Sequence, residues 1–319
     1  MSFFHEKTSL AARGKWRGIL AHFGVPRDHM DGKHHPCPVC GGSDRWRFDD
    51  LEGNGTSFCN QCQSRNGMGL VIDLTGRPFP QVAAEIDDLV GNIKPEAGRP
   101  KMADDDRRRM LREVYQLSKP IQMGDLAHVY LSSRGVAERV YPDALRFAPP
   151  LRDGDGGVRP CMVAMVGVHG DTLPNGRQRY LTMHRTFLRP DGLAKAEMAS
   201  PRKLMPGDVQ AGACVMLSEW PGYGSIGIAE GIETAMAATK LFGVPAWAAL
   251  TADMMAKWVP PEGADDVAIF ADNDQSHTGH AVAYALSRRL RAKGMVTNVH
   301  MPSRAGTDWN DELQRRGRP

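Results

Sequence analysis

Three carboxylates in the C-terminal part of the chain each follow an apolar run, and their positions suggest that they lie together. Glu230 ends the run SIGIAE, and Asp272 and Asp274 follow the run DVAIF. Each run has the composition of a buried parallel strand and precedes a helical pattern. Because open parallel sheets bind ligands at their carboxyl edge, we expect the three acids to meet there. A group of carboxylate oxygens suits Mg²⁺ or Mn²⁺.

Neighbouring polar residues have simpler interpretations. An acid that ends a strand can also cap a helix or form a surface ion pair. Neither the Glu-Gly motif at Glu230 nor the Asp-x-Asp motif at Asp272 and Asp274 is therefore specific by itself. Glu233 is expected to be an ordinary residue of the first helical turn, and Asn273 a turn residue. His277 and His280 are expected on a loop and a helix surface and not as metal ligands.

A second group of residues with possible chemistry is formed by four cysteines. Cys37 and Cys40 form one Cys-x-x-Cys pair, and Cys59 and Cys62 form another. This spacing is typical of a four-cysteine zinc ribbon, in which each pair supplies two thiolates to one Zn²⁺. The runs DRWRFDD and GTSFCNQC predict the two strands of a hairpin that holds the pairs opposite each other.

Disulfides and redox chemistry are weaker explanations of this pattern. A cytosolic chain disfavours disulfides, and a redox Cys-x-x-Cys does not explain two copies. His34 and His35 precede Cys37 and could replace a ligand, but they are expected on the surface. Cys161 and Cys214 lie alone in apolar runs and are expected to be buried structural residues.

A structural Zn²⁺ has no open coordination position, so the ribbon is expected to bind or orient a partner. Arg45, Trp46, Arg47 and Phe48 alternate charge and ring along one strand. Such a strand can stack an unpaired base on Trp46 while Arg45 contacts a phosphate. Equally, Trp46 and Phe48 can form the hydrophobic face of the ribbon.

Length and composition are those of a globular protein with two or three domains. The chain has 319 residues and a formal net charge of +3. No apolar run approaches the roughly 20 residues of a membrane span, and the first residues lack a signal-peptide core. We therefore expect a cytoplasmic protein without a membrane partner. The basic residues concentrate between positions 176 and 205, which by itself is as consistent with a solvated β-rich surface as with a binding surface.

The order of patterns predicts an α/β protein, α+β overall, with three regions. Residues 1–91 form the zinc-ribbon domain, and 92–106, rich in proline, glycine and charge, form a linker. Residues 107–220 form a basic, mixed α+β middle domain with two helices and several strands. Residues 221–319 alternate strand and helix, which predicts a parallel sheet flanked by helices.

The motifs of the chain and their order resemble those of a known family. AEGIETA, then ADND before a helix, then GTDWND at positions 306–311, resembles the Toprim domain of primases from satellite phages, plasmids and integrative elements. The first motif of that family reads Glu-Gly-x-x-Thr-Ala, matched here by Glu230, Gly231, Thr234 and Ala235. The zinc ribbon and the segment HRTFLRPDGLAKAE, with PRK after it, stand in the same order as in the family.

The resemblance implies a DNA primase that makes short RNA primers on single-stranded DNA. Asp272 and Asp274 would then hold Mg²⁺ or Mn²⁺, and Glu230 would be a metal ligand or a proton carrier. Asp308 would lie near the metal, although an Asp before a helix is also a common cap. The contacts expected for triphosphate or template backbone are Arg185, Lys195, Arg202 and Lys203, assisted by Arg45 and Trp46 of the ribbon.

The resemblance also implies partners. They are a single-stranded DNA template, ribonucleoside triphosphates and a separate replicative helicase, because no phosphate-loop motif occurs in the sequence. The setting would be the cytoplasm of a bacterial host that carries a mobile genetic element. Two alternatives use the same residues: a Toprim metal-dependent nuclease, and a non-catalytic zinc-ribbon accessory protein that binds single-stranded DNA.

Overall fold

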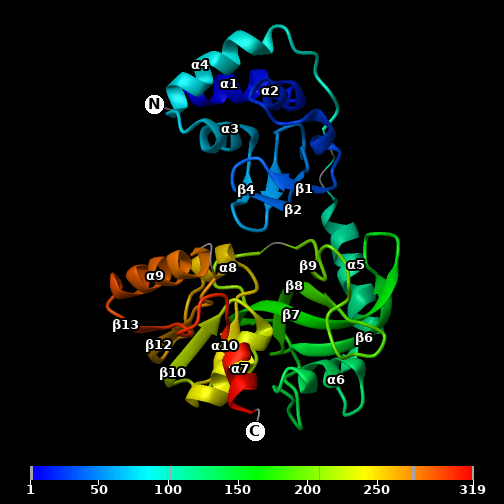
Figure 1. Cartoon of the computed structure of the whole chain (residues 1–319), viewed down its shortest axis with the longest axis vertical. Coiled ribbons are helices and arrows are strands. Elements are labelled where there is room, and N and C mark those ends of the chain that lie inside the picture. The colour runs from blue at the N-terminus through cyan, green and yellow to red at the C-terminus, as the bar shows by residue number, and fades with distance from the viewer. Residues whose placement is uncertain (1–2, 99, 101, 208, 275–276, 318–319) are drawn as a thin grey trace. The chain divides into compact units, whose positions relative to one another are not determined.

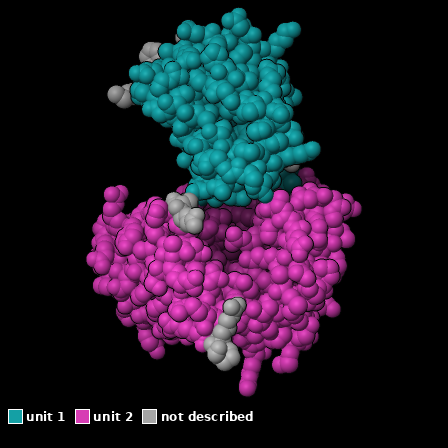
Figure 2. All heavy atoms as spheres, in the orientation of Figure 1, with its two compact units in different colours: residues 1–103 teal, residues 104–319 magenta. Residues whose placement is uncertain are grey.

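The structure is a computed structural model that describes residues 3–98, 100, 102–207, 209–274 and 277–317. Two separately packed units make up the chain, Met1–Ala103 and Asp104–Pro319 (Figure 2). Their boundary falls inside the stretch 92–106, whose composition predicts a linker. Each unit has its own hydrophobic core.

The first unit combines a small antiparallel sheet with a group of helices (Figure 1). Its strands, in sheet order, are β1 (His34–Cys37), β2 (Gly41–Phe48), β3 (Ser57–Cys59) and β4 (Gln63–Arg65). Its helices are α1 (Phe3–Ala12), α2 (Trp16–His22), the 3₁₀ turn η1 (Arg27–Met30), α3 (Gly67–Thr75) and α4 (Phe79–Val90). The predicted hairpin is present as β2 and β3, which pair antiparallel with Trp46 opposite Cys59.

Apolar spacing explains how these helices cover the sheet. α4 starts directly after Pro78, where the fixed φ of a proline suits a helix start. Val82 and Ile86 recur on one face of α4 and are fully buried. Trp46 and Phe48 are both 1% exposed and belong to the same core.

The middle region, the first half of the second unit, is built on an antiparallel sheet. Its strands, in sheet order, are β5 (Lys119–Pro120), β6 (Leu145–Arg152), β7 (Val158–Thr172), β8 (Gln178–Phe187) and β9 (Arg202–Leu204). Two helices precede it or pack on it, α5 (Asp104–Leu117) and α6 (Leu126–Ser133). The central strand β7 is buried continuously from Cys161 to Gly167, as expected for a strand covered on both faces.

The C-terminal region is a four-stranded parallel sheet with helical crossovers. Its strands are β10 (Gly224–Ala229), β11 (Ala246–Ala248), β12 (Ala264–Phe270) and β13 (Val296–His300), and their order in the sheet is β11-β10-β12-β13. Its helices are α7 (Ile232–Phe242), α8 (Ala252–Lys257), α9 (Thr278–Arg291) and α10 (Trp309–Arg316). α7 packs with α10 and α8 with α9, on opposite sides of the sheet in Figure 1. The predicted fold class is therefore confirmed.

The two sheets of the second unit share one hydrophobic core. That core includes Met162 and Phe187 of the antiparallel sheet together with Trp247 and Ile269 of the parallel sheet. A short segment joins the sheets, because Cys214 bridges to β7 and Val215 bridges to Ala248 of β11. Cys161 and Cys214 are both fully buried, as predicted. The domain division predicted between residues 220 and 221 falls inside this unit and stays a prediction.

The structure also bears on membrane insertion. Among the described residues, no helix combines the length and the apolar character needed to span a bilayer.

Candidate active site and zinc ribbon

The four cysteines of the ribbon form a group with metal-ligand geometry. Their Sγ atoms all lie within 4.8 Å of one another. The Sγ of Cys37 is 3.9 Å from that of Cys62, and the Sγ of Cys40 is 3.7 Å from that of Cys59. A tetrahedron with Zn–S bonds of about 2.3 Å has edges of about 3.8 Å, so the thiols match a four-cysteine Zn²⁺ site.

The electrostatics of the four thiols also call for a cation. Burial raises the pKa of the Cys59 thiol to about 11, and burial together with the neighbouring sulfurs raises the pKa of Cys62. Without a metal, repulsion among four thiolates this close together keeps some of the thiols protonated. A bound Zn²⁺ replaces those protons and stabilises all four thiolates. The ribbon is therefore a zinc-binding site.

The two ribbon residues predicted to contact nucleic acid lie in different surroundings. The Arg45 guanidinium donates a hydrogen bond to the side chain of Gln61, beside the second cysteine pair. Trp46 is 1% exposed, so its ring has no free face on which a base can stack. This corrects the prediction for Trp46: the ring belongs to the hydrophobic face of the ribbon, because β2 turns it toward the core of the unit.

The acidic residues lie at the carboxyl edge of the parallel sheet. β10 and β12 are adjacent and parallel, with Ala229 level with Phe270. Glu230 directly follows β10, and Asp272 follows β12 after one intervening residue. The two strand ends therefore place Glu230 and Asp272 at the same edge, as parallel strand order predicts.

The pKa of Asp272 is strongly shifted by its surroundings. Burial raises its pKa to about 7, and the negative charges of Asp308, Glu230 and Asp274 contribute, against Arg202. Its Oδ1 is buried and has no hydrogen-bond partner in the part of the chain that the structure describes. Burial also raises the pKa of Glu230; Arg202 opposes that shift and Asp274 adds to it. The edge therefore holds more negative charge than its surroundings neutralise.

Asp274 connects this edge to helix α9. Its Oδ2 accepts a hydrogen bond from the Gly279 backbone N–H at 2.9 Å. A Cβ on Gly279 would lie 2.8 Å from the carbonyl oxygen of Asp272 and 3.0 Å from the Asp274 carboxylate. Only glycine allows the helix to begin so close to both acids.

Asp308 is the cap of helix α10, and it also lies near the other acids. It caps α10: its Oδ1 accepts a hydrogen bond from the Asp311 N–H at 2.8 Å, while the Asp311 carboxylate accepts one from the Asp308 N–H. Its Oδ2 is 3.5 Å from the hydroxyl of Thr234, on helix α7. The charge of Asp308 also raises the pKa of Asp272. We therefore group Asp308 with Glu230, Asp272 and Asp274 and call these four residues the acid edge.

The acids fit a hydrated divalent cation better than a tight protein cage. Among the described residues, the four cysteines alone bring three or more ligand atoms within 4.8 Å of one another. The acids are more widely spaced, which suits Mg²⁺ because this ion keeps several waters and takes one or two carboxylates. The unpartnered Oδ1 of Asp272 offers it an oxygen.

The four cations predicted from the middle region divide between two faces of its sheet. Adjacent strand residues point to opposite faces, so Arg202 and Lys203 diverge. Lys203 shares a face with its register partner Arg185. Its Nζ bonds to the Asp155 carboxylate, and the Arg185 guanidinium donates to the carbonyl of Arg152.

Arg202 is on the face that looks toward the acids. Its charge lowers the pKa values of Asp272 and Glu230 against the effect of their burial. Among the described residues, no ion pair or side-chain hydrogen bond of its guanidinium is found. Lys195 lies toward the same side, but its Nζ is paired with Glu233 at 3.0 Å.

Two residues near the edge have no signal in the sequence. Arg134, after α6, offsets part of the burial effect that raises the pKa of Asp308, and its Nε is buried without a partner. Glu233 is in the first turn of α7 as predicted, but it is 6% exposed and accepts a hydrogen bond from Tyr130. Both depend on contacts across long sequence separations, which no local pattern shows.

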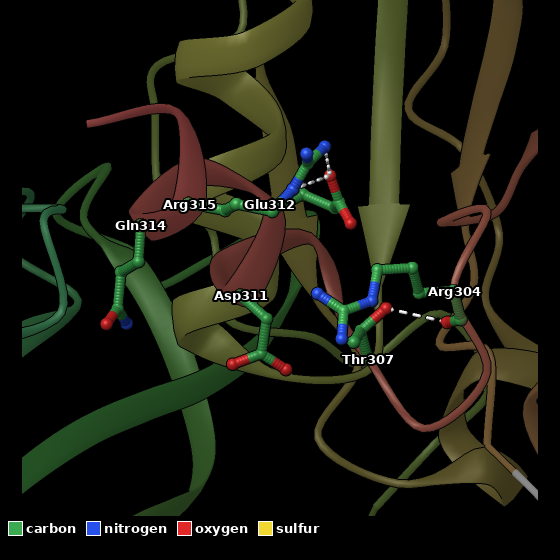
Figure 3. Close-up of a pocket in the computed structure, with 6 residues that line it drawn as sticks. All are labelled: Arg304, Thr307, Asp311, Glu312, Gln314 and Arg315. Atoms are coloured by element: carbon green, nitrogen blue, oxygen red, sulfur yellow. Dashed lines mark hydrogen bonds and ion pairs between the residues drawn. The ribbon is translucent and has the colours of Figure 1, made fainter. Parts of the chain in front are cut away.

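A cavity of about 220 Å³ lies beside α10 (Figure 3). It is lined by Arg304, Thr307, Asp311, Glu312, Gln314 and Arg315. Three of its four charged side chains are already engaged: Arg315 pairs with Glu312, and the Asp311 carboxylate completes the cap of α10. The cavity borders the acid edge through this cap and does not contain it.

Removing one ribbon thiol should remove the zinc. We expect purified protein to contain one zinc per chain and Cys40→Ser to contain little, because three thiolates bind Zn²⁺ far less tightly than four. Zinc is measured by elemental analysis after dialysis. Cys161→Ala is the matched control, since that buried cysteine lies in the other unit. Full zinc in Cys40→Ser would contradict the assignment.

Neutralising Asp272 should stabilise the second unit. Its pKa is higher in the folded chain than the usual value of 3.8 for an aspartate, so its contribution to stability is fully present below pH 3.8 and is lost as the pH rises through about 7. Asp272→Asn removes this loss and should raise the midpoint of thermal unfolding by about 5 °C at pH 8 and by less at pH 5. Circular dichroism in magnesium-free buffer measures it.

The control for this experiment is Asp171→Asn, which removes an acid paired with Arg179 on the surface. That change should shift the midpoint by about 1 °C or less. A midpoint that falls in Asp272→Asn, or a gain of equal size at both pH values, would show that the edge is not under electrostatic strain.

Comparisons with known proteins agree with this architecture. Residues 32–70 match the zinc-binding domain of primase-helicase, residues 105–216 match a domain of unknown function, and residues 225–319 match the Toprim domain. The first match contains the four cysteines, and the third contains Glu230, Asp272, Asp274 and Asp308.

Among solved structures, the primase fragment of the bacteriophage T7 primase-helicase protein is 16% identical. The alignment covers 89% of this chain and 95% of that chain, with a TM-score of 0.39. The zinc-binding and RNA polymerase domains of the Aquifex aeolicus primase are 13% identical over 95% of this chain and 80% of that chain, with a TM-score of 0.42. At TM-scores below 0.5 these likenesses carry no inference. The family matches and the geometry of the four cysteines show that the chain combines a zinc-binding domain of the primase-helicase family with a Toprim domain.

Proposed function

We propose that the protein is a DNA primase, which synthesises short RNA primers on single-stranded DNA by metal-assisted nucleotidyl transfer. The observation that carries the proposal is the state of Asp272. Its Oδ1 is buried without a hydrogen-bond partner, and its pKa is raised to about 7 by burial and by the acids around it. Such a strained carboxylate group is what a divalent cation relieves.

The acid edge would hold Mg²⁺ or Mn²⁺. The ion would neutralise triphosphate charge, orient the attacking 3′ hydroxyl and stabilise the leaving pyrophosphate. Asp272 and Asp274 would be its main ligands, and Asp308 would contribute the oxygen that does not cap α10. Glu230 would complete the set or carry a proton, and its raised pKa suits a group that must hold a proton before transferring it.

Cations of the middle region would receive the negatively charged substrates. Arg202 acts on Asp272 and Glu230, Arg134 acts on Asp308, and Lys195 pairs with Glu233 in the helix that follows Glu230; these three cations would contact the triphosphate. Arg185 and Lys203 lie on the other face of the sheet and would contact the template backbone after exchanging their present partners. Phosphate contacts of this kind make binding dependent on salt concentration.

The zinc ribbon would hold the single-stranded template. With Trp46 buried, Arg45 is the predicted ribbon contact that remains available, and it would bind phosphate and not a base face. A separate replicative helicase would supply the unwound strand, in the cytoplasm of a bacterial host, as part of the replication of a mobile element.

Primer synthesis tests the proposal directly. The full-length protein is incubated with a panel of single-stranded templates, Mg²⁺ or Mn²⁺ and labelled ribonucleotides. We expect short oligoribonucleotides, and a loss of about 10²–10³-fold in Glu230→Gln, Asp272→Asn and Asp274→Asn, because each removes charge from the cation site without changing its shape.

Asp171→Asn is again the control and should keep synthesis near the wild-type level. An absence of product on every template and with both metals would overturn the proposal. Cleavage of labelled DNA without nucleotides would indicate a Toprim nuclease. Tight binding of single-stranded DNA with neither reaction would indicate the accessory role.

A further inference from the structure

The acid three residues after Glu230 is buried and paired in a way that the proposed chemistry does not use. Glu233 is 6% exposed. The Nζ of Lys195 lies 3.0 Å from its Oε1, and the Tyr130 hydroxyl donates a hydrogen bond to the same oxygen. Burial alone would raise the pKa of Glu233, but Lys195 and Tyr130 lower it to about 2. Glu233 is therefore an anion at any working pH.

The three side chains come from three different elements of the second unit. Tyr130 is on α6, Lys195 is on the loop between β8 and β9, and Glu233 is in the first turn of α7. Helix α7 begins at Ile232, two residues after Glu230, so the contacts of Glu233 join the middle region to the segment that carries Glu230.

The backbone of the loop that carries Lys195 is already fixed. Lys195 bridges to Leu188, and the hydroxyl of Ser133 on α6 donates a hydrogen bond to the Leu193 carbonyl at 2.9 Å. Gly192 has a φ of 71°, and a Cβ there would lie 3.0 Å from the carbonyl oxygen of Leu126. The backbone of the loop is thus packed against α6. The conformational freedom that the pair with Glu233 restricts is therefore that of the four-carbon side chain of Lys195.

Stability alone does not account for the ion pair. Replacing a buried pair by well-packed apolar residues is often neutral or stabilising, because desolvation of both charges offsets their attraction. Here the desolvation falls mainly on Glu233, since the Lys195 side chain is 31% exposed, and the tyrosine hydrogen bond adds a second partner to the buried carboxylate, which suggests a need for a fixed charge at this position.

The Lys195 ammonium lies on the same side of the acid edge as Arg202. The Lys195 side chain is 31% exposed, and its ammonium has three donors, so donors remain for a ligand beside Glu233. Burial lowers the pKa of His184 to about 3, and Arg202 and Lys195 both add to this, so both cations lie near that ring. Arg202 in turn acts on Asp272.

We propose that Glu233 is a positioning residue that holds the Lys195 ammonium ready for the phosphates of an incoming nucleoside triphosphate, while Tyr130 orients the Glu233 carboxylate. The inference rests on the proposed function and adds two residues that act through Lys195. Without the carboxylate, the lysine side chain would have to be ordered at each binding event, and the lost side-chain entropy would weaken nucleotide binding.

The test compares the full-length wild type with Glu233→Gln, Tyr130→Phe, Lys195→Met and the Glu233→Gln/Lys195→Met double variant. Nucleotide affinity is measured by polarisation of a fluorescent GTP analogue with Mg²⁺, and KM and kcat by primer synthesis. Glu233→Gln should raise the dissociation constant and the KM about tenfold while kcat changes about twofold or less. Tyr130→Phe should shift both in the same direction by less.

The double variant separates positioning from independent effects. If Glu233 acts through Lys195, the double variant binds nucleotide no more weakly than Lys195→Met alone. Lys195→Met leaves Glu233 as a buried anion without its cation, so its unfolding midpoint falls, and adding Glu233→Gln restores it.

Glu138→Gln is the matched control, because it removes the acid of the Lys240–Glu138 pair, which also joins α7 to the middle region but whose acid is 45% exposed. It should leave nucleotide binding unchanged. Unchanged or tighter binding in Glu233→Gln, or additive losses in the double variant, would overturn the inference. Weaker binding in Glu233→Gln from a wild type that makes no primer would sustain the inference and refute the proposed function.

Discussion

Mutual repulsion among buried carboxylates is the constraint on which the second unit depends. Parallel pairing of β10 and β12 brings Glu230 and Asp272 to one edge, and the start of α10 adds Asp308. Burial weakens the solvent screening that would keep these charges independent, and it raises the pKa of Asp272 to about 7. The fold holds together a group of charges that would separate in water, and it does so with backbone elements that cannot move apart individually.

The positions of Arg202 and Lys195 relative to the acids are also fixed by the packing of the second unit. Because both sheets of the second unit share one core, the face of the antiparallel sheet that carries Arg202 has a set position relative to the acids. The Glu233 carboxylate adds a second connection between the two regions, because it accepts a hydrogen bond from Tyr130 on α6 and pairs with Lys195 on the loop between β8 and β9. Two regions with different chain patterns therefore behave as one rigid support for opposite charges.

Much of this arrangement could be predicted from the sequence, and the failures have physical reasons. Parallel strands fix the ends at which Glu230 and Asp272 appear, and Cys-x-x-Cys spacing fixes the thiols, so both groups follow from local pattern. Trp46 was ambiguous because alternation identifies two faces of a strand and does not say which is covered. Arg202 and Lys203 are neighbours in sequence, yet pleating separates them. The roles of Arg134 and Glu233 arise from contacts between distant elements.

Asp308 divides its two oxygens between the cap of α10 and the acid edge. Two residues later, in the first turn of α10, Asn310 donates a hydrogen bond from Nδ2 to the carbonyl of Arg134 at 2.7 Å and is fully buried. The start of the last helix is therefore bonded both to the acids and to the backbone of the segment that follows α6. The first turn of the C-terminal helix thus acts as a noncovalent cross-link between one sheet edge and a segment 176 residues earlier in the chain.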